Sequence, residues 1–352
     1  MKTPYFLMHQ EKLEKNLAKL KMIEKQSGVK ILHTVKSFNQ TQILPLIASQ
    51  LSGMSIGNVN ELKMAQKAKA QHIHLYAPAY KKEALEAIID NVSTLSFNSL
   101  SQWKSLHKLT TKASMGLRIN PRLHLPIPDH CNPNLDYSRL GVEYLEFIEF
   151  FHNNSTDFDN LEGLHFHALF QSSEFGTTLL IEHILEHYQT ILPQLEWINL
   201  GGGHNFTSDN FNVNNFTEAV NNFQVLYPNI QLYFEPGEAV TKGCGEFIST
   251  VLDIIHIAGV NVVILDTSTE THLLDVAIVN QRLHIKGTQS DSTPYFYELS
   301  GNSCIQGDLI GEYFFQNPLS IGDKVIFEDM MGYTMVKMTE FNGIEKAGFL
   351  LN

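Results

Sequence analysis

The chain has 352 residues, of which 43% are hydrophobic and 10% aromatic, enough for one large domain and a smaller one and too many for a disordered protein. Its formal net charge of −12 disfavours nucleic-acid binding and is compatible with cationic substrates. No apolar run spans a bilayer, the start lacks a signal-peptide pattern, and the three cysteines without paired spacing suit a reducing compartment. We therefore expect a cytoplasmic protein without membrane or nucleic-acid partners.

Strand-like and helical stretches alternate along the first two thirds of the chain. An extended start at 5–8 is followed by an amphipathic helix that ends at Ser27-Gly28. Strands are predicted at 29–35, 54–56, 72–77, 94–97, 115–119, 163–168, 197–200 and 230–234. Helices are predicted at 42–51, 60–70, 81–89, 100–108, 142–152, 174–192 and 215–226, with an irregular loop at 121–139. This order favours a parallel (β/α)8 TIM barrel, with a doubly wound open sheet as the alternative.

The sequence pattern changes from about Glu238 onward, where the alternation of strands and helices ends. Short, β-branched, turn-bounded segments at 247–257, 260–266, 281–286 and 324–327 predict an antiparallel β domain. We therefore expect a barrel over residues 9–237 and a β domain over 238–352 that also takes in residues 1–8.

Polar residues and glycines fall at the ends of nearly all the predicted barrel strands. They are Lys36, Asn58, Asn98, Arg118 with Asn120, His167, Gly201-Gly202-Gly203 and Glu235. Barrel enzymes place their chemistry at this end of the strands, which is a further argument for the barrel.

Lys36 follows a run of strand-forming residues, where an ammonium group is costly to bury. The position becomes reasonable if the amine forms a Schiff base with an aldehyde cofactor. The alternative is a lysine that extends from a strand end into solvent.

The glycine run at Gly201–Gly203 follows the seventh predicted strand, where barrels frequently bind phosphate; an ordinary turn is the alternative. His165 and His167 share one face, but no Asp, Glu or Cys with ligand spacing accompanies them, so we expect no metal. His167 is better used to stack on an aromatic cofactor. We interpret His72 and His74 as structural.

Glu235 ends the last barrel strand. A carboxylate facing a pyridine nitrogen would keep that nitrogen protonated and make the ring a strong electron sink. With Lys36, His167 and the glycine run it describes a site for pyridoxal phosphate. A capping or ion-paired glutamate is the alternative for this residue alone.

These residues belong to a series of motifs that extends nearly end to end. The series comprises Thr3-Pro4-Tyr5, the Lys36 segment, 117–121, 138–141, 163–167, 199–204, 235–239, 265–268 followed by His272 and Asp275, Ser303-Cys304 with Gly307-Asp308, Gly332-Tyr333 and 341–343. In their order and number they resemble the barrel-type pyridoxal-phosphate decarboxylases related to alanine racemase and ornithine decarboxylase. Within that superfamily the chain is most similar to the carboxynorspermidine/carboxyspermidine decarboxylases.

The resemblance implies a role for each matching position. Lys36 would carry the cofactor as a Schiff base, His167 would stack on its ring, and Glu235 would pair with the ring nitrogen. Gly201, Gly202, Gly203 and Tyr333 would hold the phosphate. Cys304 matches a cysteine that reaches a neighbouring subunit's site and protonates Cα, which implies a homodimer with shared active sites.

One position departs from the related ornithine and diaminopimelate decarboxylases, which have an arginine three residues after the glutamate of the Glu-Pro-Gly motif. Here that position is Glu238. A carboxylate there suits a substrate with several amines, and Asp275 would serve a second amine. We also assign Asp308 and His272 to substrate binding.

The sequence thus predicts a carboxy-lyase that converts carboxynorspermidine or carboxyspermidine to norspermidine or spermidine in polyamine biosynthesis. The nearest rival is a decarboxylase of diaminopimelate or another basic amino acid. A racemase is less compatible with Glu235. A non-catalytic pyridoxal-phosphate carrier protein, or a barrel enzyme without this cofactor, is the alternative from another class.

Overall fold

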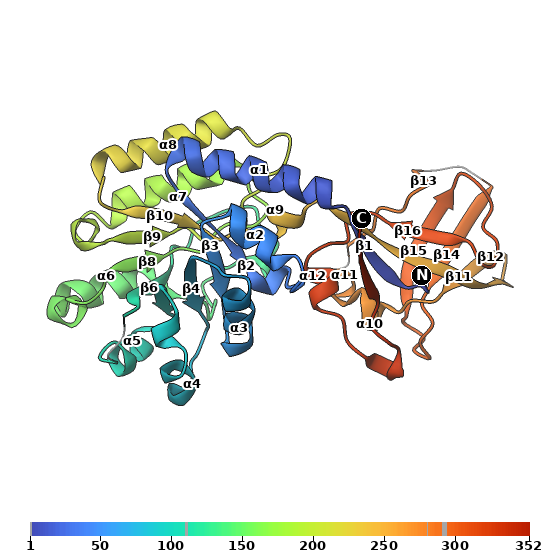
Figure 1. Cartoon of the computed structure of the whole chain (residues 1–352), viewed down its shortest axis with the longest axis horizontal. Helices are drawn as coiled ribbons and strands as arrows, with labels where there is room; N and C mark the ends of the chain where they lie inside the picture. The colour runs from blue at the N-terminus through green and yellow to red at the C-terminus, as the bar shows by residue number, and fades with distance from the viewer. Residues whose placement is uncertain (1, 110–111, 280, 291–293) are drawn as a thin grey trace. The chain divides into compact units, whose positions relative to one another are not determined.

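The computed structural model describes residues 2–109, 112–279, 281–290 and 294–352 (Figure 1). Two compact units make up the chain: Asn16–Val240, and Met1–Lys15 together with Thr241–Asn352. No helix in the described ranges combines the length and the apolar character needed to cross a bilayer.

Parallel strands with helices between them form the first unit, as the alternating pattern predicts (Figure 1). The strands are β2 (Lys30–Thr34), β3 (Gly53–Ile56), β4 (His72–Tyr76), β5 (Thr94–Phe97), β6 (Ser114–Asn120), β8 (Gly163–His165), β9 (Trp197–Asn199) and β10 (Gln231–Phe234). The pairings β5–β6 and β10–β2 close them into a ring. This closure confirms the (β/α)8 barrel and excludes the open sheet.

Helices surround the barrel. They are α1 (Gln10–Ser27), α2 (Leu44–Gln50), α3 (Val59–Lys67), α4 (Lys82–Glu86), α5 (Leu100–Leu106), α6 (Tyr144–Asn153), α7 (Glu174–His187) and α8 (Val213–Leu226). Among them, α3, α5, α6, α7 and α8 are capped by side chains. The Asn58 side chain accepts hydrogen bonds from the first amides of α3, and Asn212 does the same for α8. These caps lie in the loops that follow barrel strands, so they fix each helix start beside the site.

Strand register places functional side chains in common layers inside the barrel. Arg118 on β6 is level with His165 on β8, which is level with Asn199 on β9. On the neighbouring strands, Ser55 on β3 is level with His74 on β4, which is level with Thr94 on β5. Since paired residues of parallel strands point to the same face, each group can meet within the barrel.

A sheet dominates the second unit. Its strands are β1 (Tyr5–Met8), β11 (Gly245–Ile257), β12 (Val260–Leu265), β13 (Thr288–Gln289), β14 (Tyr295–Ser300), β15 (Leu309–Phe315), β16 (Lys324–Phe327) and β17 (Gly348–Leu351). Short helices α10 (Thr269–His272), α11 (Leu274–Val279) and α12 (Tyr333–Val336) lie between them in the sequence, and α9 (Glu238–Thr241) follows β10. As predicted, the extended start joins this sheet, because β1 pairs with β11.

Three local predictions differ from the structure. The sheet is mixed rather than wholly antiparallel, because β1 pairs in parallel with β17 and β12 with β14. Residues 281–286 do not form the predicted strand. Within this segment Ile285 makes one isolated bridge, to Phe327. The helix predicted from 142 begins at Tyr144, because Val142–Glu143 first pairs with β6 as β7.

Candidate active site

Lys36 lies just beyond β2, in a 3-10 turn at Val35–Ser37. The Thr34 hydroxyl donates to the carbonyl of Glu235 at 2.7 Å, and the Ser37 hydroxyl donates to the carbonyl of Thr34 at 2.7 Å. These bonds tie the lysine turn to the end of β10. The predicted lysine and glutamate are thereby presented together at the carboxyl end of the barrel.

The Lys36 side chain lines a pocket of about 390 Å³ together with Arg118, His167 and the loop around Asp129–Arg139. The side chain is open to the pocket, yet the protein surrounds its amine. Burial and the positive charge of Arg118 lower the pKa of Lys36, against the opposing effect of Glu235. A lowered pKa increases the fraction of neutral amine, the form that attacks an aldehyde.

Glu235 is 5% exposed at the end of β10. Asn199 donates a hydrogen bond to its Oε1 at 2.7 Å. Burial raises the pKa of Glu235, while hydrogen bonds from Asn199 and Ser55 act in the opposite direction. A buried carboxylate with a raised pKa is suited to share a proton with a cationic ring nitrogen.

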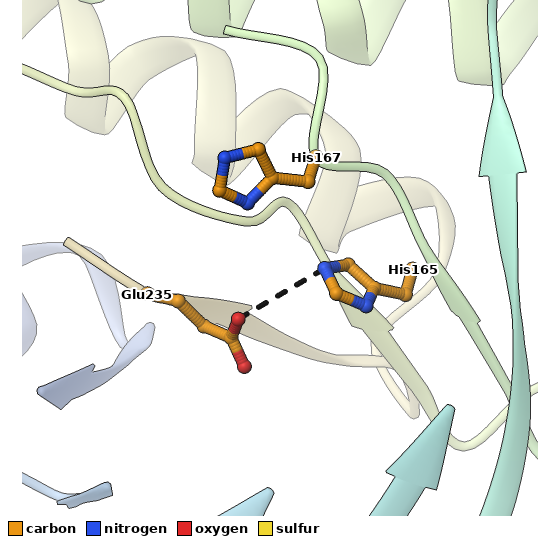
Figure 2. Close-up of side chains that lie close together, drawn as sticks. All are labelled: His165, His167 and Glu235. Atoms are coloured by element: carbon orange, nitrogen blue, oxygen red, sulfur yellow. Dashed lines mark ion pairs between the residues drawn. The ribbon is translucent and has the colours of Figure 1, made fainter. Parts of the chain in front are cut away.

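Two histidine rings flank this carboxylate. His74 Nε2 lies 3.8 Å from Oε1 of Glu235, and His165 Nε2 lies 3.9 Å from Oε2, the contact drawn in Figure 2. Burial lowers the pKa of His74 to about 3 and that of His165 well below its usual value. Both rings are therefore neutral near pH 7, and Glu235 has polar neighbours without a paired cation at these positions.

His167 is held by main-chain groups. The amide of Gly202 donates to its Nδ1 at 3.2 Å, and Arg118 donates to its carbonyl oxygen at 3.3 Å. Burial and the charge of Arg118 keep the pKa of His167 well below its usual value. A neutral imidazole fixed in this way presents a flat face for stacking on an aromatic ring.

The glycine run packs too tightly for side chains. A Cβ on Gly202 would lie 2.5 Å from the carbonyl oxygen of Glu235, and one on Gly203 would lie 2.1 Å from that of Leu169. Gly203 also has a φ of +87°, which favours glycine. The Gly201 amide donates to Asn199 Oδ1 at 2.8 Å and the Gly202 amide to His167 Nδ1, so the cradle offers an anion close approach to backbone rather than three unused amides.

The structure corrects one premise of the metal prediction, because it brings an acidic residue to the two histidines. Potential ligand atoms of His165, His167 and Glu235 lie within 4.8 Å of one another (Figure 2). However, the Nδ1 lone pair of His167 already accepts the Gly202 amide, and a metal on the other nitrogen would require a proton on Nδ1. The absence of a metal stays a prediction.

Glu238 begins α9, directly after the Glu-Pro-Gly motif. It is half-buried, and both carboxylate oxygens receive long hydrogen bonds of 3.4 Å from Gln171. Gln171 lies after β8, so Glu238 lies at the same barrel end as Lys36.

The remaining predicted residues lie in the sheet unit. Asp275 on α11 accepts a hydrogen bond from Thr334 at 3.0 Å, and burial raises its pKa. Tyr333 precedes Thr334 at the start of α12, and the ammonium of Lys337 lies 5.4 Å from its ring centre. Asp275 and Tyr333 are thus neighbouring positions, as a shared site requires.

Asp308 and His272 have many internal contacts. Asp308 is 2% exposed and accepts hydrogen bonds from the amide and hydroxyl of Thr269, each at 2.8 Å, and from the amide of Ser303 at 2.9 Å. His272 is fully buried; its Nε2 contacts the carbonyl of Glu345 at 2.9 Å and its Nδ1 accepts from the amide of Ser268 at 3.1 Å. These contacts favour positioning roles, and Asp308 orders the loop that carries the exposed Cys304.

Sequence reasoning missed three contributors to the barrel site. His74 was interpreted as structural, although it lies beside Glu235. Asn199 and Ser55, which hydrogen-bond Glu235, were not assigned a role. Asn199 ends β9 and Ser55 lies next to the end of β3, the same signal that identifies Lys36, whereas His74 lies in the middle of β4 and has no such signal.

A lysine, a buried carboxylate, a neutral histidine and a glycine cradle on one barrel rim define the class of pyridoxal-phosphate enzymes. A model of the pyridoxal-binding domain of pyridoxal-dependent decarboxylases matches residues 11–242, and the chain belongs to this family. It is a decarboxylase, and pyridoxal phosphate is its cofactor.

The similar proteins narrow the class further. Carboxynorspermidine/carboxyspermidine decarboxylase of Campylobacter jejuni is 34% identical over 363 residues, covering 100% of this chain and 93% of that protein. Carboxyaminopropylagmatine decarboxylase of Synechocystis is 34% identical, covering 97% and 88%. The crystal structure of carboxynorspermidine decarboxylase from Campylobacter jejuni complexed with norspermidine matches with a TM-score of 0.91 and 32% identity, covering 100% and 94%.

Proposed function

We propose that this enzyme decarboxylates carboxynorspermidine or carboxyspermidine and releases norspermidine or spermidine in polyamine biosynthesis. The observation that carries the proposal is the 34% identity to a carboxynorspermidine/carboxyspermidine decarboxylase over the whole chain. The net charge of −12 also favours a cationic substrate. Diaminopimelate decarboxylases are more distant, for example 24% identical over 71% of the chain, which makes that rival weaker.

A second candidate substrate is carboxyaminopropylagmatine, because a decarboxylase of this compound from Synechocystis is equally similar at 34% identity. Agmatine ends in a planar guanidinium, whereas norspermidine and spermidine end in a primary ammonium. A guanidinium prefers bidentate carboxylate contacts, so the two candidates make different demands on the acidic residues of the site.

The residues of the barrel fit the cofactor. The glycine cradle has room only for backbone, and Nε of the buried Arg118 and both ring nitrogens of the buried His165 lack hydrogen-bond partners among the described residues. Lys36 would bind the cofactor aldehyde, Glu235 its ring nitrogen, His167 its ring face, and Gly201–Gly203 its phosphate. When bound, pyridoxal phosphate supplies a ring that takes up the electrons left as CO2 departs.

We assign the remaining steps to side chains of this chain. The lowered pKa of Lys36 favours the neutral amine, the form that would bond to the cofactor aldehyde. Cys304 delivers a proton to the substrate Cα after CO2 leaves, and Tyr333 assists at the phosphate. Glu238 and Asp275 bind substrate amines, while Asp308 and His272 support the loops around them.

A cytoplasmic homodimer with shared active sites completes the proposal. Large apolar side chains are exposed on the sheet unit, including Ile257, Leu309 and Ile321 at 55%, 47% and 66%. These exposures are compatible with a subunit contact on the sheet unit. All three cysteines lie in described parts of the chain and none forms a disulfide bond there, which suits a reducing compartment.

Product analysis tests the substrate assignment. Purified enzyme given carboxynorspermidine should release norspermidine, identified by mass spectrometry. Glu238→Gln should raise KM for this substrate about tenfold, since one ion pair to an amine is lost. Glu246→Gln, a half-exposed glutamate on β11, is the matched control. Failure to decarboxylate carboxynorspermidine, and likewise carboxyspermidine and carboxyaminopropylagmatine when each is supplied separately, would contradict the proposal, and would favour the carrier alternative if the cofactor still binds.

A further inference from the structure

Two strands beside Glu235 carry a continuous chain of hydrogen bonds. His72 Nε2 lies 3.0 Å from the Thr94 hydroxyl, and the same hydroxyl lies 2.7 Å from His74 Nδ1. On its other side, His74 Nε2 lies 3.1 Å from the Ser96 hydroxyl and 3.8 Å from Oε1 of Glu235. The hydrogen-bonded chain therefore runs from His72, at the start of β4, to Ser96 on β5, and His74 Nε2 lies beside the carboxylate of Glu235 without bonding to it directly.

The chemistry of Thr94 restricts this chain to two arrangements. A hydroxyl has one proton, so Thr94 donates to one of the two histidines and accepts from the other. If it donates to Nδ1 of His74, the proton of that neutral ring is on Nε2 and points toward Ser96 and Glu235. If it donates to His72 instead, His74 carries its proton on Nδ1 and turns the Nε2 lone pair toward Glu235.

The charge of Glu235 selects between the arrangements. An ionised carboxylate attracts an N–H group and repels a lone pair, so it favours the proton on Nε2. Thr94 is 5% exposed, His74 1% and Ser96 fully buried, so water is poorly placed to substitute for a missing partner. The Ser96 hydroxyl can donate or accept at His74 Nε2, so both orientations keep their hydrogen bonds, and the charge of Glu235 is what separates them.

We propose that His74 is a positioning residue whose tautomer, fixed by Thr94 with His72 behind it, aims a neutral N–H at Glu235 and holds the carboxylate ionised and oriented toward the cofactor ring. The inference rests on the proposed role of Glu235. It assigns a function to a histidine pair that pattern reasoning interpreted as structural.

A neutral N–H group on His74 is suited to orient the Glu235 carboxylate without cancelling its charge. Burial lowers the pKa of His74 to about 3 and that of His72 to about 4, so neither ring is charged at neutral pH. A cation at the same place would neutralise Glu235 and weaken its attraction for a protonated ring nitrogen. A dipole stabilises the carboxylate and leaves its charge for the cofactor.

Nitrogen-15 NMR of histidine-labelled protein, with and without pyridoxal phosphate, tests the proposal directly. His74→Gln identifies the signals of the His74 ring. We expect the holoenzyme to show a protonated Nε2 and an unprotonated Nδ1 for His74. The opposite tautomer, or a doubly protonated ring, would overturn the proposal.

Variants of Thr94 supply a second readout. Thr94→Val keeps the shape but removes the hydroxyl, and should produce a mixture of His74 tautomers and about tenfold weaker cofactor binding to the apoenzyme. Thr94→Ser should restore both properties. Thr177→Val, which removes another fully buried threonine hydroxyl on α7, should change neither.

Unchanged tautomer and cofactor affinity in Thr94→Val would also overturn the proposal. Both readouts are obtained without substrate. A wrong substrate assignment would therefore appear as missing CO2 release beside an intact His74 signal, and failure of this inference would appear as the wrong tautomer in an active enzyme.

Discussion

Lys36 is the residue on which cofactor binding depends. Lys36→Ala should abolish the visible absorbance of the bound cofactor and lower turnover by roughly three orders of magnitude or more, because no other amine is held in its place. Absorption spectra and CO2 release measure the two effects. Lys30→Ala, an exposed lysine at the start of the same strand, is the control and should change neither. Retained turnover in Lys36→Ala would contradict the assignment.

Glu235 links stability to pH in the apoenzyme. Its pKa is raised above the ordinary 4.5 by burial, so the folded state binds its proton more tightly than the unfolded state does. Its contribution to stability is present below pH 4.5 and is lost as the pH rises through the folded pKa. Glu235→Gln should therefore make the apoenzyme more stable than wild type above that range, while weakening cofactor binding.

Denaturant unfolding of both apoenzymes between pH 4 and pH 8 checks this prediction. The difference between the variants should grow with pH and then level off. A difference that is constant with pH, or a destabilised Glu235→Gln apoenzyme, would show that burial does not dominate the environment of this carboxylate.

At the residue scale, the sequence predicted groups that lie at strand ends and missed the partners that barrel closure brings to them. Lys36 and Glu235 could be identified because each ends a recognisable strand. His74 could not, because its proximity to Glu235 depends on strands far apart in the sequence meeting across the barrel. The periodicity of a strand shows on which face of the sheet a side chain lies. It does not show how close that side chain comes to a residue far away in the sequence.

At the scale of elements, the glycine loop after β9 should tolerate no side chain. Gly202→Ala would place a Cβ 2.5 Å from a backbone oxygen, so the loop must shift and cofactor affinity should fall at least about tenfold. Fluorescence titration of the apoenzyme with pyridoxal phosphate measures the affinity. Gly57→Ala, after β3, meets its first neighbour at 3.4 Å and is the matched control. Equal cofactor affinities in the two variants would contradict the proposal that Gly201–Gly203 hold the cofactor phosphate.

Asp308 should stabilise the folded protein, because its hydrogen bonds with Thr269 and Ser303 order the loop that carries Cys304. Burial favours its protonated form, but the hydrogen bonds from Thr269 and Ser303 outweigh burial and lower its pKa below the ordinary 3.8. Its contribution to stability is therefore present above pH 3.8 and is lost as the pH falls through the folded pKa. Asp308→Asn should cost about 1–3 kcal/mol at pH 7, measured by denaturant unfolding. A loss that does not shrink at all as the pH falls progressively below 3.8 would contradict this account.

The elements themselves were predicted best where patterns are long and regular. All barrel strands were expected within a few residues, because each is a buried run between two helical stretches. The sequence pattern does not predict strands β13, β14, β15 and β17, because pairing across the sheet, rather than local pattern, decides whether these segments are strands. For the same reason the parallel pairings of β1 with β17 and of β12 with β14 were not foreseen.

At the scale of the whole molecule, shared active sites predict complementation between inactive variants. Lys36→Ala and Cys304→Ala, mixed in equal amounts and allowed to exchange subunits, should form mixed dimers in which one of two sites has both residues. Activity should then recover to about a quarter of the wild-type value. Size-exclusion chromatography with light scattering confirms the dimer. Activity no greater than the sum of the separate variants would contradict shared sites.

The most direct test of the central claim is CO2 release by the purified holoenzyme with each candidate substrate separately. The panel comprises carboxynorspermidine, carboxyspermidine, carboxyaminopropylagmatine, meso-diaminopimelate, ornithine and arginine, compared by kcat/KM. We predict the highest values for the carboxylated polyamines, with carboxynorspermidine and carboxyspermidine ahead. Preference for diaminopimelate, ornithine or arginine would retain the barrel and its cofactor but contradict the proposed function.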